Sequence, residues 1–322
     1  MRRRDAAPRT RLAGVFAPPA LAASVADRFV DAVAGAHAGL LVAAVALHVS
    51  AQVCRGLAWH GVLSAPWPGV TRRRACAWHV CGAGLSGVLS PRGGDAVRMT
   101  LARRELRDAT WPALAGTLCA EASFETISGL TMMLAAVALG VGRLHAPPVA
   151  LLAAAALAAL AVAVLAARSD RVRRTVREVG RGAAVLRRPG HCVRHVLPFQ
   201  AGARMLRLGS ATCFLLAFGL PVAPAIVVAA VLAQGSGAAV PLPGAGLAAI
   251  GAALLVALPF AAGHPLDGGA LASLAVAWPA AITIAGVAIS LGLLASLCGA
   301  RTPRALLRAA RALRTQPAPI VP

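Results

Sequence analysis

The chain has 322 residues, of which 58% are hydrophobic and only 13% are charged. This composition excludes a soluble globular protein of that size, because too few polar side chains remain to cover its surface. All 32 basic residues are arginines, and a net charge of +21 would suggest nucleic-acid binding in a soluble chain. Here the arginines lie in loops between apolar runs, as they do where a membrane protein faces an anionic cytoplasmic leaflet. The sequence therefore predicts an all-α, multi-pass protein of the inner (plasma) membrane with no nucleic-acid partner.

The first 33 residues predict a basic cytoplasmic arm with six arginines. An apolar run from Leu12 to Val25 leaves a signal peptide as the alternative, but Pro18 and Pro19 inside that run favour the arm. Residues 34–300 then form a transmembrane domain, and residues 301–322 form a basic cytoplasmic tail.

The first predicted span is Ala34–Cys54, which contains no charged residue. Its 21 residues are long enough to cross about 30 Å of hydrocarbon. His48 and Gln52 lie four residues apart, so we expect them to share a helix face that looks into the bundle. Arg55 and Trp59 are expected to be interfacial anchors at the end of this span.

A short second crossing is predicted for Ala75–Leu89, which ends at the motif Ser90-Pro91-Arg92-Gly93-Gly94. Proline and glycine break a regular helix there. A re-entrant hairpin is the alternative, but it would change the side on which the later arginines lie, so their distribution favours a crossing. Gly82, Gly84 and Gly87 match the dinucleotide pattern GxGxxG, but no strand precedes them, so we interpret them as sites of close helix packing.

Six further spans bring the predicted total to about eight. They are Trp111–Val141, Pro148–Ala167, Val196–Gly219, Val222–Val240, an apolar run from Gly246 to Gly263, and Gly269–Ala300. A basic loop at residues 168–195 carries nine arginines. In this scheme 25 arginines lie on the side of both termini, which the positive-inside rule makes cytoplasmic.

A second break at Pro241–Gly246 resembles the first, and Pro91 and Pro243 are 152 residues apart. Paired broken segments in two halves of a chain indicate the binding site of a transporter. Two helix-terminating turns explain the same residues equally well. The prediction is two Pro/Gly-broken or re-entrant segments in two pseudo-repeated halves, with Gln234, Pro243 and Gly244 as candidate translocation residues.

Two pairs of charged residues fall inside apolar runs. Glu121 and Glu125 share one helix face, and Arg204 and Arg207 lie one turn apart. Left unpaired near the bilayer midplane, these four charges would cost about 10 kcal/mol, so they must be paired, protonated or hydrated. The arginines are then either counter-charges or a site for an anionic headgroup; the alternative is a purely structural ion-pair cluster.

Arg92, Asp95 and Arg98 lie three residues apart beside the first break. If a helix begins there, Arg92 and Arg98 could contact a lipid phosphate through their guanidinium groups and the free amides of the helix start. The alternative is a positive-inside anchor.

No metal or cofactor is expected. His191, Cys192 and His195 lie close together in sequence but lack a fourth ligand. No pair of a nucleophile and a base is apparent, so we do not expect an enzyme.

Several segments resemble the flippase-like membrane domain of the lysylphosphatidylglycerol synthases and their stand-alone bacterial relatives. They are Arg55–Trp59, Leu89–Arg98, Ala120-Glu121 with Phe124-Glu125, Gly202–Gly219, and Pro241–Gly244. The resemblance implies a helical bundle with broken segments near the midplane that moves a charged lipid or lipid-linked headgroup between leaflets. The aminoacyl-transferring domain is not expected here, so lipid synthesis is not implied.

The sequence thus predicts a lipid flippase whose partners are membrane lipids, with a homo-oligomer or an envelope-assembly partner as further options. One alternative is a membrane enzyme on lipid-linked phosphates or sugars that uses the same carboxylates as acid and base. The other is a scaffold that binds an envelope-assembly partner through its arginine loop.

Overall fold

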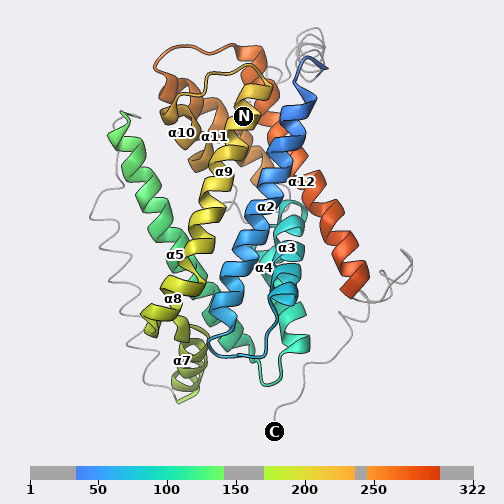
Figure 1. Cartoon of the computed structure of the whole chain (residues 1–322), viewed down its shortest axis with the longest axis vertical. Helices are drawn as coiled ribbons and strands as arrows, with labels where there is room; N and C mark the ends of the chain where they lie inside the picture. Colours follow the sequence, from blue (N-terminus) through green and yellow to red (C-terminus); the bar gives the residue numbers. More distant parts are fainter. Residues whose placement is uncertain (1–33, 141–169, 236–244, 298–322) are drawn as a thin grey trace, which may run out of the picture.

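The computed structural model describes residues 34–140, 170–235 and 245–297 (Figure 1). Within these ranges the chain is helical and contains no strand, which confirms the predicted all-α class. The longest of the described helices are α2 (Ala38–Leu63), α5 (Trp111–Ala138), α9 (Leu197–Ala217) and α12 (Gly268–Leu297). Two of them, α2 and α12, are long and apolar enough to cross a membrane.

Helices α2 and α9 pack side by side in opposite directions. At one end the amide of His37, just before α2, donates to the carbonyl of Ala217 at the end of α9 (3.2 Å). Further along, the Ser210 hydroxyl donates to the carbonyl of Ala44 (2.8 Å). At the other end Gly61 lies against the backbone of His195, where any side chain would overlap the carbonyl oxygen. The two backbones therefore stay close along their whole length.

The first Pro/Gly motif joins two antiparallel helices, α3 (Arg72–Leu89) and α4 (Pro91–Glu105). Figure 1 shows α3 leaving the end of the molecule where α2 finishes, and α4 returning to that same end. The two helices touch through glycines, since a Cβ on Gly82 would lie 2.5 Å from the carbonyl oxygen of Gly94. The residues predicted as a short crossing, Ala75–Leu89, therefore form the first arm of a hairpin.

The turn of this hairpin is built by Ser90 and Pro91. Ser90 has a φ of 127°, which places its backbone in a region that residues other than glycine rarely adopt. Its hydroxyl accepts a hydrogen bond from the amide of Gly93 (3.1 Å), so Ser90 caps α4. Pro91 occupies the first turn of α4, where its missing N–H has no cost. The motif that predicted a helix break thus also starts the next helix.

The tip of the hairpin lies beside the middle of α12. A Cβ on Gly87, near the end of α3, would lie 2.8 Å from the hydroxyl oxygen of Thr283, halfway along α12. One turn earlier, a Cβ on Gly84 would overlap the carbonyl of Gly286. This confirms that Gly82, Gly84 and Gly87 serve close helix packing, and it shows that the hairpin reaches only half the length of the bundle.

A second pair of helices lies in the region of the predicted sixth and seventh spans. Helix α10 (Pro224–Gly235) packs against α11 (Ala245–Ala262). Short links join α10 to α9 and α11 to α12, so both outer ends lie where α9 finishes and α12 begins (Figure 1). Residues 236–244, which connect the two helices and include Pro243 and Gly244, lie outside the described residues.

The two hairpins occupy equivalent places in two halves that run in opposite directions. The first lies between α2 and α5 and enters from one end of the molecule, whereas the second lies between α9 and α12 and enters from the other. Each hairpin packs on the last helix of the other half, α3 on α12 and α10 on α5.

The basic segment forms a short helical region at the end of the molecule where α2 finishes and α9 begins (Figure 1). It contains α7 (Asp170–Gly182), a single 3-10 turn η1 (Ala184–Arg187) and α8 (Pro189–His195). Helix α7 packs on the first turns of α5, where Gly182 lies against the backbone of Ala113. Arginines of the first hairpin's open ends, among them Arg74 and Arg104, therefore share this end with the basic segment.

Two apolar clusters hold the bundle together. One surrounds Phe214 and Trp278, whose rings stack with centroids 4.8 Å apart and join α9 to α12. The other surrounds Trp59 and Trp78, whose rings meet edge to face at 6.4 Å and join α2 to α3. The predicted arm at residues 1–33, the predicted span Pro148–Ala167 and the tail at residues 301–322 lie outside the described residues.

Candidate functional site

Seven charged side chains gather where α2, α4, α5 and α9 meet. We call them the charge cluster: Arg55, Asp95, Arg98, Glu121, Glu125, Arg204 and Arg207. The ion pairs form a chain in which negative and positive side chains alternate. This chain begins with Asp95 on α4 and ends with Arg204 on α9. The cluster lies near the middle of α5 and α9.

Glu121 is the centre of the buried part. One carboxylate oxygen accepts from Nη1 of Arg98 (2.6 Å), and the other accepts from Nη2 of Arg55 (3.1 Å). Arg98 also pairs through Nη2 with Asp95 on its own helix (2.7 Å). Glu121 is only 3% exposed and Arg98 7%. Short, charge-assisted bonds of this kind compensate the desolvation of the groups that make them.

The guanidinium of Arg98 is also held from the side of α2 and α3. Its Nη1 donates to Nδ1 of His79 (2.9 Å), and its centre lies 5.1 Å from the ring centroid of Trp59. The Trp59 indole N–H in turn donates to the hydroxyl of Thr117 (3.3 Å). A cation over an aromatic face, fixed by hydrogen bonds on both sides, has little freedom to move. Arg98 therefore locks the first hairpin onto α5.

Glu125 is held more loosely. It pairs with Nη2 of Arg55 at 3.3 Å and with Nη2 of Arg204 at 3.5 Å, and its side chain is 27% exposed. Arg204 also donates from Nε to the hydroxyl of Ser128 (2.9 Å). The charge cluster therefore has a tight, buried side at Glu121 and a looser, accessible side at Glu125.

Arg207 differs from the other arginines of the cluster. It lies one turn before Ser210, which bonds to α2, so the antiparallel packing places Arg207 opposite α2 near His48. Its Nε is buried and has no hydrogen-bond partner. No carboxylate in the part of the chain that the structure describes lies within 4 Å of its guanidinium, although other cluster members act on it electrostatically.

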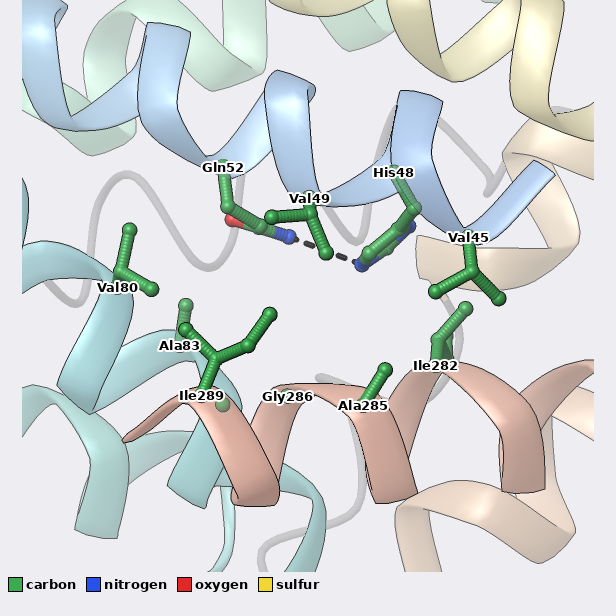
Figure 2. A pocket seen from close by; sticks show the side chains of 11 residues that line it. Val45, His48, Val49, Gln52, Val80, Ala83, Ile282, Ala285, Gly286 and Ile289 are labelled. Carbon is green, nitrogen blue, oxygen red and sulfur yellow. Dashed lines mark hydrogen bonds between the residues drawn. The ribbon is translucent and has the colours of Figure 1, made fainter. Parts of the chain in front are cut away.

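A small cavity of about 40 Å³ lies between α2, α3 and α12 (Figure 2). Figure 2 shows His48 and Gln52 on its α2 side, joined by a hydrogen bond between Nε2 of each (3.2 Å). An amide nitrogen can only donate, so the imidazole accepts at Nε2 and carries its proton on Nδ1. That N–H and Oε1 of Gln52 are both buried without a partner. The prediction that these two residues share a face turned into the bundle is confirmed.

The structure brings most of the predicted site residues together, in the charge cluster: Asp95, Arg98, Glu121, Glu125, Arg204 and Arg207. Arg92 is exposed and lies outside the cluster, so the expected pairing of Arg92 with Arg98 on a phosphate is wrong as a geometry. Arg98 itself is occupied by two carboxylates. Gln234 lies half-buried in α10 and takes part in none of the ion pairs of the cluster. Pro243 and Gly244 fall outside the described ranges.

Arg55 and Trp59 were expected to be interfacial anchors, and that expectation is wrong. The Arg55 side chain is 19% exposed and bridges both glutamates, and Trp59 is 1% exposed. A signal for this was present, because residues 48, 52, 55 and 59 follow helical spacing and share one face. No spacing pattern in the sequence indicated His79, because its contact with Arg98 depends on the packing of α3 against α4.

His191 and Cys192 are both engaged in hydrogen bonds to backbone carbonyls. His191 donates from Nε2 to the carbonyl of Gly61 (2.8 Å), whereas the Cys192 thiol donates to the carbonyl of Val185 (3.0 Å). Burial raises the pKa of the Cys192 thiol above its usual value, which disfavours the thiolate that a metal requires. No group of three metal-ligating side chains occurs among the described residues.

Comparison with protein-family models, with curated proteins and with solved structures found no match to this chain. The fold and the charge cluster therefore carry the functional argument.

Proposed function

We propose that this chain is a multi-pass membrane protein that translocates an anionic phospholipid or lipid-linked headgroup between leaflets without covalent chemistry. The observation that carries the proposal is a buried charge cluster halfway along a helix bundle, between two hairpins that enter from opposite ends. Intramembrane charges are costly and mark transport pathways, and hairpins of two inverted halves mark the substrate site of transporters. The resemblance to the flippase-like domain of lysylphosphatidylglycerol synthases points to the same activity.

The exposed surface of the bundle suits a lipid environment. On α5 the exposed fraction is 64% for Ile127, 52% for Leu130, 60% for Leu134 and 51% for Val137, at spacings of three and four residues. Such a stripe would be a liability in water and is expected where a helix faces acyl chains.

Polar side chains on α5 support the same interpretation. The exposed hydroxyls of Ser123, Thr126 and Thr131 each donate to the carbonyl four residues earlier in the helix. A hydroxyl bonded to its own backbone needs no water, so it can face hydrocarbon.

The end that carries α7 and α8 faces the cytoplasm in this proposal, because the described arginine loops concentrate there. Helix α12 finishes at this end, and helix α2 begins at the opposite end.

The looser side of the cluster is where a headgroup would enter. Glu125 makes only long pairs, so an incoming phosphate can replace it beside Arg204 without exposing Glu121. The tight ion pairs of Glu121 keep the first hairpin in place while the headgroup is bound. The acyl chains of the substrate lipid stay in the bilayer along α5. Both oxygens of Glu121 already accept from arginines, which favours charge balance over the acid–base role that a lipid-phosphate enzyme would need.

The proposal is tested by reconstituting purified protein into phosphatidylcholine vesicles that contain a trace of fluorescent phosphatidylglycerol. Dithionite then bleaches only outer-leaflet lipid, so inner-leaflet fluorescence decays at the translocation rate. Wild-type protein is expected to accelerate this decay. Glu125→Gln is expected to slow translocation roughly tenfold, because Arg204 then lacks its carboxylate and holds the headgroup more tightly by about 1.4 kcal/mol.

The matched control is Glu105→Gln, which removes a carboxylate that pairs with Arg74 at the open end of the hairpin. It should translocate at the wild-type rate. Wild-type vesicles that bleach no faster than protein-free vesicles, for phosphatidylglycerol and for a polyprenyl phosphate alike, would overturn the proposal.

A further inference from the structure

The charge cluster contains more positive than negative charge. Four guanidinium groups face three carboxylates, and the three carboxylates are already engaged by Arg98, Arg55 and Arg204. Arg207 remains without an ion-pair partner among the described residues. An uncompensated charge in a medium of low dielectric constant is strongly unfavourable.

The rest of the sequence offers few carboxylates that could fill this role. Residues 141–169, 236–244 and 298–322 contain no aspartate or glutamate. Of the described carboxylates outside the cluster, Glu105 pairs with Arg74, Glu178 accepts from Thr110, and Asp267 caps α12. The other two, Asp108 and Asp170, form no ion pair with Arg207. Three aspartates before residue 34 complete the inventory of acids that the structure leaves undescribed. The missing negative charge is thus more simply supplied by a ligand.

The unbonded polar atoms around the cluster are also unbalanced, because hydrogen-bond donors outnumber acceptors. Six polar atoms there are buried without a partner: Nδ1 of His48, Oε1 of Gln52, Nε2 of His79, and Nε of Arg55, Arg98 and Arg207. His79 accepts at Nδ1 from Arg98, so its Nε2 carries the proton, and five of the six atoms are N–H donors. A ligand that satisfies them must offer acceptors and few donors. This requirement follows from hydrogen bonding and is independent of the charge count.

We propose that Arg207, together with the His48–Gln52 pair, binds a phosphate oxyanion. A phosphodiester carries one negative charge and only acceptor oxygens, so it matches both the excess charge and the excess donors. It would bring the net charge of the cluster to zero, whereas a headgroup with an added ammonium group would leave one positive charge uncompensated. That the phosphate belongs to a lipid headgroup rests on the proposed function; the site itself does not.

Binding is measured on the detergent-purified full chain by the rise in unfolding temperature with added dioctanoyl-phosphatidylglycerol, dioctanoyl-phosphatidylcholine or inorganic phosphate. Phosphatidylglycerol is expected to raise it more than phosphatidylcholine does. Arg207→Gln keeps hydrogen-bonding capacity but removes the charge, so it is expected to weaken phosphatidylglycerol binding about 10- to 100-fold. Arg207→Lys should restore part of the effect. Arg194→Gln, which removes an exposed arginine from α8, should bind as the wild type does.

The unfolding temperature without ligand separates a binding role from a structural one. If Arg207 awaits an anion, Arg207→Gln removes an uncompensated charge, and the ligand-free protein should be as stable as wild type or more stable. A ligand-free Arg207→Gln variant that unfolds well below both wild type and Arg194→Gln would show that Arg207 is structural and would overturn the proposal.

The outcomes also distinguish this site from the proposed function. Translocation by the wild type together with unchanged phosphatidylglycerol binding by Arg207→Gln would overturn the site and leave the translocase standing. Arg207-dependent binding without translocation would do the reverse. A shift with inorganic phosphate but none with phosphatidylglycerol would support the oxyanion site and assign it to free phosphate instead of lipid.

Discussion

Glu121 holds arginines from two different helices, and its side chain is almost fully buried. Replacing it by glutamine would leave Arg98 and Arg55 each with one carboxylate fewer in a dry environment. Removing one partner of a buried pair costs about 3–5 kcal/mol of folding free energy. We therefore expect Glu121→Gln to lower the unfolding temperature in detergent markedly, with the free energy of unfolding reduced by that amount.

Glu105→Gln provides the comparison for Glu121→Gln. It also removes a carboxylate from an ion pair, but its partner Arg74 is 60% exposed, so the change should stay below about 1 kcal/mol. Equal destabilisation by the two substitutions would contradict the account of Glu121 as the centre of the buried cluster.

Residue-level predictions from the sequence succeeded where the signal was local. The spacing of Glu121 and Glu125 predicted a shared face in need of counter-charges, and Arg204 does lie against Glu125. Arg55, which pairs with both glutamates, is 66 residues away from Glu121. Such a pairing depends on how α2 and α5 pack, and no spacing within either helix specifies it.

The hairpin of α3 and α4 depends on backbone contact at glycines. A Cβ on Gly94 would overlap the carbonyl oxygen of Gly82 and lie 2.8 Å from Cβ of Ser86. We expect Gly94→Ala to push the two helices apart and to destabilise the protein by about 1–3 kcal/mol, the usual cost of overpacking. The measurement is the unfolding temperature in detergent.

Gly129→Ala is the matched control, since a Cβ on Gly129 in α5 would meet nothing within 4 Å. There the better helix propensity of alanine should stabilise the protein by up to about 1 kcal/mol. The two substitutions should therefore have opposite signs. A shared sign would mean that close backbone contact does not determine the hairpin.

Hydropathy could not separate a hairpin from a crossing. The apolar residues 75–89 of α3, which follow three arginines, suit either. What decides is that Ser90 caps a new helix and Pro91 begins it, so the chain reverses where the sequence predicted only a break. A capping serine followed by proline is a helix-start signal. Ser90 and Pro91 carry this signal in addition to the helix break.

Over the whole molecule, two oppositely directed halves place one hairpin at each end of the bundle. The repeated Pro/Gly motif predicted one break in each half of the chain. It could not predict from which end of the bundle each broken segment enters, because a sequence repeat carries no such information. The charge cluster lies beside the tip of the first hairpin, where α2 and α9 of the two halves meet. In the proposed mechanism the charge cluster receives the phosphate of the lipid, and the arginine-rich end at α7 and α8 does not.

The most direct test of that claim is an experimental structure of the full chain in phosphatidylglycerol nanodiscs. We predict phosphate density within hydrogen-bonding distance of the Arg207 guanidinium and of the His48–Gln52 pair. A structure in which Arg207 pairs with an aspartate from before residue 34, and phosphate density occurs only at α7 and α8, would contradict the claim.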